Sequence, residues 1–141
     1  MTTTLRLLAF VLIAAAAVAD CIPFTAAPNH LGESRCVKGK VVNIGESKGG
    51  TLYLNFCEDY KKCAFAVVIF PSNLKDVGDV RLLKDKDIEI YGKITDWRGR
   101  TEMVLRDVRQ LKGEAARIPP IPKDYDVQKK GGFSAGEFKK K

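Results

Sequence analysis

The sequence of 141 residues contains little of the chemistry that enzymes use. Its single histidine, His30, lies outside the predicted strands and has no recognisable triad context, so the serines have no plausible base. The four cysteines include no pair with the short C-x2-4-C spacing that is usual in structural zinc sites. We therefore expect no enzymatic activity, no catalytic residue, no bound metal and no cofactor.

Long apolar runs are absent after position 19, so no later segment could span a bilayer. Residues 1–19, by contrast, hold 15 apolar residues, with Arg6 near the start and Ala17-Val18-Ala19 at the end. This pattern predicts a signal peptide cleaved after Ala19, a secreted or periplasmic protein, and no stable membrane insertion after cleavage. Two alternatives stay open, an uncleaved membrane anchor and a lipoprotein attached through Cys21.

All four cysteines follow the predicted cleavage site, so they would enter a compartment in which disulfides persist. Cys57 and Cys63 stand at the two ends of a polar segment between two apolar runs, which predicts a bridge across the mouth of a hairpin. Cys21 would then pair with Cys36 and join the N-terminal segment to the first strand. Zinc binding is the competing interpretation of the same residues.

Composition divides the chain into a signal peptide (1–19), an irregular lead-in (20–33), a folded domain (34–111) and a tail (112–141). The tail is poor in apolar residues, contains a proline-rich stretch and ends in lysines, so we expect it to be extended or disordered. The net charge of +7 lies mostly outside the folded part. Residues 20–111 hold 15 basic and 13 acidic residues, whereas the tail holds eight basic and four acidic residues.

Alternation of apolar and polar residues predicts five strands, at 35–44, 51–57, 64–70, 87–95 and 101–108. A short helix, broken near Gly78, separates the third strand from the fourth. Placing Cys57 opposite Cys63 puts Asn55 opposite Phe65 and Tyr53 opposite Val67. The core face of the second and third strands then holds Leu52, Leu54, Phe56, Ala64, Ala66, Val68 and Phe70. A slip of one residue would reverse this assignment.

Similar alternation in the last two strands predicts which side chains face inward. The inward positions are Ile88, Ile90, Ile94, Met103 and Leu105, and the outward positions include Tyr91, Lys93 and Glu102. In the first strand, Val37, Gly39 and Val41 share a face opposite Lys38 and Lys40, and a glycine within a strand indicates a bend or bulge.

Three strands, a short helix and two strands in about 80 residues are the layout of an OB barrel. Residues 30–111 resemble small exported bacterial members of the OB-fold nucleic-acid-binding superfamily, of the anticodon-binding and helicase-associated type. The most distinctive segments are Leu52-Tyr53-Leu54-Asn55-Phe56 and Phe65-Ala66-Val67-Val68-Ile69-Phe70. The resemblance implies an all-β fold, a five-stranded OB-fold Greek-key barrel with a short helix between strands 3 and 4.

An OB barrel binds single strands through aromatic side chains that stack on bases and a basic groove that holds phosphates. The resemblance therefore implies a non-enzymatic protein that binds single-stranded DNA or RNA with low sequence specificity. The stacking groups would be Tyr53, Phe65 and Trp97, the base-edge or ribose contact Asn55, and the phosphate contacts Lys38, Lys40, Lys48, Lys93, Arg98, Arg100 and Arg106.

Each of these residues also has a purely structural interpretation. Tyr53 and Phe65 would form a covered cross-strand pair, Trp97 would lean on the rim of the barrel, and the lysines would be a solvated face. A nuclease would need metal-binding carboxylates beside an arginine, for which Asp96, Glu102 and Arg100 are the candidates. The second functional hypothesis is an exported module that binds a protein, peptide or glycan, or an envelope or stress-related component, because a fold does not determine its ligand.

Overall fold

The computed structural model describes residues 20–125, so the predicted signal peptide at 1–19 and the tail residues 126–141 lie outside the described residues. Within this range the strands are β1 (Ile22–Pro23), β2 (Ser34–Lys40), β3 (Asn43–Glu46), β4 (Leu52–Asn55), β5 (Ala66–Ile69), β6 (Asp87–Lys93), β7 (Thr95–Trp97) and β8 (Arg100–Val104). The helical elements are the α-helix α1 (Leu74–Val77) and the 3-10 turns η1 (Phe24–His30), η2 (Tyr60–Lys62), η3 (Pro71–Asn73), η4 (Val80–Leu83), η5 (Val108–Gln110) and η6 (Gly113–Arg117).

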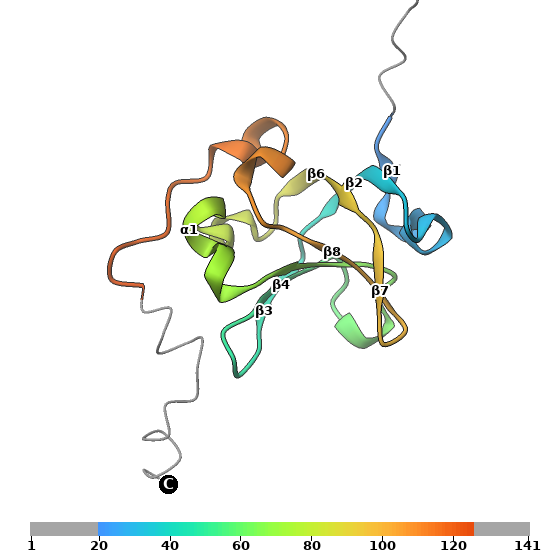
Figure 1. Ribbon diagram of the computed structural model, residues 1–141, viewed down its shortest axis with the longest axis horizontal. Helices are drawn as coiled ribbons and strands as arrows, with labels where there is room; N and C mark the ends of the chain where they lie inside the picture. The colour runs from blue at the N-terminus through green and yellow to red at the C-terminus, as the bar shows by residue number, and fades with distance from the viewer. Residues whose placement is uncertain (1–19, 126–141) are drawn as a thin grey trace, which may run out of the picture.

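The strands form two mixed sheets instead of one closed barrel (Figure 1). A three-stranded sheet has the order β1-β2-β6, and a five-stranded sheet has the order β3-β4-β5-β8-β7. The pairs β1–β2 and β5–β8 are parallel, and the other pairs are antiparallel. The predicted five-stranded OB-fold Greek-key barrel is therefore wrong, although the fold is mostly β, with a short helix between β5 and β6.

Two of the predicted strands change partners along their length, which explains the division into two sheets. The N–H of Val41 donates to the carbonyl of Lys86, continuing the pairing of β2 with β6. The N–H of the next residue, Val42, donates to the carbonyl of Asn55 and begins the pairing of β3 with β4. Ile94 separates β6 from β7 in the same way. Apolar alternation continues through both corners, so it does not reveal where the hydrogen-bond partners change.

The register of β4 and β5 differs by one residue from the predicted register. Asn55 pairs with Ala66 and Tyr53 with Val68. Cys57 and Cys63 lie beyond the ends of both strands, so their disulfide does not mark a paired position. The slip places Phe65, Val67 and Ile69 in the core cluster and leaves Phe70 exposed. Ala66 and Val68, predicted for the core face, are also buried, but they lie outside that cluster.

Gly39 of β2 is explained by close packing instead of by a bulge. The ladder between β2 and β6 continues through Gly39, which pairs with Ile88. A Cβ at this position would lie 2.7 Å from Cδ1 of Phe56 and 2.8 Å from Cδ1 of Phe24. These two rings stack with their centroids 5.3 Å apart. The predicted faces of the strand are confirmed, because Val37 is buried and Lys38 is exposed.

The segment after β8 packs more closely than the sequence predicts. The N–H of Lys112 donates to the carbonyl of Glu89, Ala115 is buried, and the N–H of Asp79 donates to the carbonyl of Pro119. In Figure 1 this orange-to-red segment passes beside α1. The predicted break of the connector is confirmed, since Gly78 ends α1 with a φ of 113°.

Both predicted disulfides, Cys21–Cys36 and Cys57–Cys63, are present. Two disulfides in a small domain fit an oxidising location outside the cytoplasm. Among residues 20–125, the helices are too short and too polar to cross a membrane.

Candidate functional site

A cleft of about 330 Å³ lies over the outer face of β3 and β4, at the side of the five-stranded sheet away from the core. Seven residues line it, from β3, β4, η2, β8 and the turn after β3: Gly45, Glu46, Ser47, Tyr53, Asn55, Tyr60 and Arg100. Three of these, Tyr53, Asn55 and Arg100, are predicted contact residues. We call this hollow the tyrosine cleft.

Strand alternation explains why Tyr53 and Asn55 reach the tyrosine cleft. Leu52 and Leu54 are buried in the core, so the side chains between and after them point to the opposite face of β4. On β3, Gly45 pairs with Tyr53. A Cβ at Gly45 would lie 3.1 Å from Nδ2 of Asn55, so the glycine leaves room for the amide at the floor of the cleft.

Asn55 is the most informative residue of the tyrosine cleft. The residue is only 5% exposed and its amide forms no hydrogen bond with residues 20–125, but the amide atoms themselves reach the solvent of the cleft. Water in the cleft can therefore satisfy this amide, and a ligand that enters would replace those hydrogen bonds. The donors and the acceptor of this amide line the cleft and are available to a ligand.

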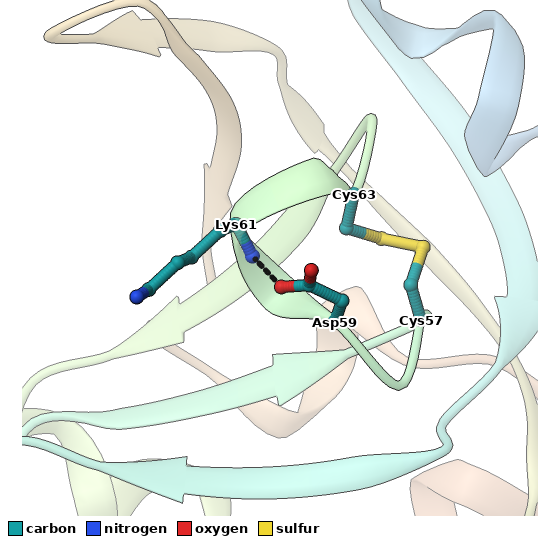
Figure 2. Close-up of a disulfide and its surroundings, with 4 residues drawn as sticks. All are labelled: Cys57, Asp59, Lys61 and Cys63. Carbon is teal, nitrogen blue, oxygen red and sulfur yellow. Dashed lines mark hydrogen bonds between the residues drawn. A yellow bond between two sulfur atoms is a disulfide. The ribbon is translucent and has the colours of Figure 1, made fainter.

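Tyr60, which the sequence analysis missed, forms one wall of the tyrosine cleft. It lies in η2, inside the loop that the Cys57–Cys63 disulfide closes (Figure 2). Within that loop the carboxylate of Asp59 accepts a hydrogen bond of 3.0 Å from the backbone N–H of Lys61. The position of Tyr60 midway between two bridged cysteines is the sequence signal that could have identified it.

A guanidinium group lies against the exposed ring of Tyr60. Cζ of Arg100 is 5.5 Å from the ring centroid, which is within the range of a cation–π interaction. In Figure 1 the light-green turn containing η2 lies next to the β7–β8 hairpin from which Arg100 comes. Tyr60 is 47% exposed, and Nζ of Lys61 also lies 6.0 Å from its ring centroid, so two cations border this exposed ring.

Trp97 lies at the tip of the β7–β8 hairpin, as predicted, and is 59% exposed. It pairs with Arg100 across the hairpin, and Cζ of Arg98 is 5.3 Å from its ring centroid. The turn is fixed by Asp96, whose carboxylate accepts a hydrogen bond from the N–H of Gly99. The alternative in which Trp97 covers the rim of the fold is inconsistent with this exposure.

Phe65 does not belong to the surface. The prediction of a stacking role for it is wrong, because the side chain is 1% exposed and its ring lies 5.6 Å from that of Phe56 in the core. The one-residue difference in register is the physical reason, since it turns Phe65 from the outer face to the inner face.

The predicted cations do not form one continuous patch. Lys38 and Lys40 lie on β2 in the other sheet, where they stand opposite Glu89 and Asp87 in the register of β2 and β6. Lys48 lies in the turn between β3 and β4. Lys93 and Arg106 line a second cleft, together with Tyr91, Gly92, Thr95, Val104 and Gln110. Of the predicted cations, only Arg100 lines the tyrosine cleft.

Glu102 does not have the exposed position predicted for it. Its side chain is 7% exposed, and burial raises the pKa of its carboxyl group above the ordinary value, with Asp96 adding to the rise and Arg100 opposing it. Among residues 20–125, the potential metal ligands that come together are Cys21, Cys36 and Glu89. Both sulfur atoms of that group are bonded to each other, so they are not available as thiolate ligands.

No protein-family model, curated protein or solved structure matched this chain in the three comparisons.

Proposed function

We propose that this is an exported, non-enzymatic protein that binds single-stranded nucleic acid with low sequence specificity through the tyrosine cleft. The observation that supports this most is the Asn55 amide, which forms no hydrogen bond with the described residues and lines the cleft together with two tyrosine rings and a guanidinium group. Stacking of a base on an aromatic ring contributes about 1–3 kcal/mol and tolerates any base. An amide offers both donors and acceptors, so Asn55 accommodates different base edges.

Charge supports the same ligand class only locally. Arg100 provides a planar cation at the tyrosine cleft, and Arg98 lies beside the exposed Trp97. Residues 20–111 have a net charge of only +2, so a strand would be held by these local contacts instead of by a strong overall field. Affinity should therefore depend on salt through a small number of phosphate contacts.

Export completes the proposal. The two disulfides fit an oxidising compartment, and residues 1–19 have the sequence pattern of a signal peptide with cleavage after Ala19. Mass spectrometry of the mature N-terminus tests this part. A chain that begins at Asp20 is the expected result. An acylated chain that begins at Cys21 would show instead that the protein is a lipoprotein.

Binding is tested by fluorescence anisotropy with a labelled dT12 oligonucleotide and the oxidised protein at low salt. Tyr53→Ala should weaken binding at least fivefold, because about 1 kcal/mol of stacking is lost. The matched variant Tyr53→Phe keeps the ring and should bind like the parent protein. Circular dichroism of both variants verifies that they fold. Absence of binding by the parent protein, or equal loss in both variants, would contradict the proposal.

A glycan is the second candidate ligand, because the carboxylate-bearing residue Glu46 lines the same cleft as the two tyrosines. Tyrosine rings and a carboxylate suit a neutral sugar, since the carboxylate accepts hydrogen bonds from hydroxyl groups. Calorimetry with a neutral oligosaccharide distinguishes the two ligands. Saturable binding of the sugar without binding of dT12 would favour this candidate.

A further inference from the structure

A second cleft of about 340 Å³ lies where β6 meets the end of β8. Its lining includes an exposed aromatic ring, Tyr91, and two exposed cations, Lys93 and Arg106. Neither cation forms an ion pair with another residue in the range 20–125. We call this hollow the basic cleft.

Acidic side chains are absent from the lining of the basic cleft. Two other clefts on the molecule do have acidic linings. Asp87 and Glu114 line both of them, and Glu89 lines one of them as well. The carboxylate nearest in sequence, Asp107, accepts hydrogen bonds of 2.9 and 3.0 Å from the guanidinium of Arg109. The basic cleft therefore offers cations that no described carboxylate neutralises, which suits an anionic ligand.

The wall of the basic cleft is fixed by one side chain, Gln110. Its Oε1 accepts hydrogen bonds from the N–H groups of Arg106 and Asp107, at 2.7 and 3.2 Å. Its Nε2 donates to the carbonyls of Tyr91 and Val104, at 3.1 Å each. A side chain that joins β6, β8 and η5 in this way holds the cations on a preformed frame.

Gly92 allows Gln110 to come this close. A Cβ at position 92 would lie 3.1 Å from Nε2 of Gln110 and 2.9 Å from the sulfur of Met103. The basic cleft is therefore part of the packed framework, and binding an anion there would not require the backbone to rearrange.

The two clefts lie along the same face of the five-stranded sheet. Met103 points into the core, so Arg100, Glu102 and Val104 point to the outer side of β8. Arg100 lines the tyrosine cleft and Val104 lines the basic cleft. Arg106 follows Arg100 by six positions, a span of at most about 20 Å, or roughly six stacked nucleotides at ~3.4 Å each.

We propose that the basic cleft binds the phosphate backbone of the same strand whose bases occupy the tyrosine cleft, so that one strand crosses the sheet along β8. This inference rests on the proposed function and adds a second subsite and a minimum ligand length to it. Lys93 and Arg106 hold the phosphates, and Tyr91 provides a ring at the far end of the path.

Oligonucleotide length tests this inference. The oxidised protein is titrated with labelled dT3, which can fill only one cleft, and with dT12, which can reach both. The test variant is Lys93→Gln with Arg106→Gln, and the control variant Lys75→Gln with Lys84→Gln removes the same charge from exposed positions that line neither cleft.

We expect the test variant to bind dT3 like the parent protein and dT12 at least tenfold more weakly. The slope of log affinity against log salt for dT12 should fall by about 1.4, because two phosphate contacts of ~0.7 each are lost. The control variant should retain the parent slope. Equal effects of the two variants on dT12, or no effect of either, would overturn the second subsite while leaving binding at the tyrosine cleft intact. Failure of the parent protein to bind either oligonucleotide would contradict the proposed function and this inference together.

Discussion

The Cys57–Cys63 disulfide should stabilise the fold modestly but control the tyrosine cleft strongly. It closes a loop of seven residues, whereas Cys21–Cys36 closes a loop of 16 residues. In the chain-entropy relation, loops of these lengths correspond to about 2.4 and about 3.1 kcal/mol of stability. Replacing Cys57 and Cys63 by serine should therefore reduce the free energy of unfolding less than replacing the other pair.

The effect on binding should have the opposite order. The short loop positions Tyr60 against Arg100, so the Cys57→Ser, Cys63→Ser variant should lose the stacking contribution of that ring. A loss of about 1 kcal/mol or more weakens oligonucleotide binding at least fivefold. Cys21 and Cys36 connect the N-terminal segment to β2 of the other sheet, so their replacement should leave the affinity unchanged under conditions in which the protein is folded.

Urea denaturation followed by circular dichroism measures the two stabilities, and anisotropy with labelled dT12 measures the affinities. The reasoning is refuted if the Cys57–Cys63 variant binds like the parent protein, or if both variants lose affinity in proportion to their lost stability. The second result would mean that the disulfide acts on the whole fold and not on the position of Tyr60.

Three further predictions follow from the packing. Phe65→Ala should cost about 3–5 kcal/mol of stability in urea denaturation, whereas a surface stacking residue would cost far less, so a change below 1 kcal/mol would contradict its place in the core. Gly78→Ala should lower the urea midpoint by the equivalent of roughly 1–3 kcal/mol, because φ is 113° and a Cβ would lie 2.7 Å from the carbonyl oxygen of Pro119; an unchanged midpoint would contradict that contact. Burial raises the pKa of the Glu102 carboxyl group in the folded state, so ionisation of this group destabilises the fold. The destabilisation is fully present above the folded-state pKa and disappears as the pH falls through the unfolded-state pKa near 4.5. Glu102→Gln should therefore raise stability at pH 7 relative to pH 4, as measured by thermal denaturation at both pH values, and an equal change at the two would be inconsistent with a buried carboxylate.

Local patterns in the sequence located most of the strand residues and predicted both disulfides, although they did not show where two of the predicted strands divide. The alternation around Leu52 and Leu54 places Tyr53 and Asn55 on the outer face, and the spacing of Cys57 and Cys63 predicts their bridge. These features depend on neighbouring residues only. They therefore identify part of the candidate site without any knowledge of how the sheets are arranged.

Features that depend on distant contacts were not predictable in the same way. The prediction of a closed barrel was wrong because the backbone N–H groups of Val41 and Val42 donate to different segments, at Lys86 and at Asn55, and no local pattern specifies this. The predicted register of β4 and β5 was wrong by one residue, because a disulfide that lies beyond the strand ends is compatible with either register. Tyr60 lies in a polar loop without periodicity, and its role depends on Arg100, which is 40 residues later in the chain.

The central claim is that the outer face of the five-stranded sheet binds a single strand. Photocrosslinking of the full, oxidised chain to a 5-bromodeoxyuridine oligonucleotide, followed by peptide mass spectrometry, locates the contact residues directly. Crosslinks at Tyr53, Tyr60 or Trp97 are the predicted result. Crosslinks confined to the lysine-rich residues 126–141 would contradict the account, because they would place the strand on the tail instead of on the sheet.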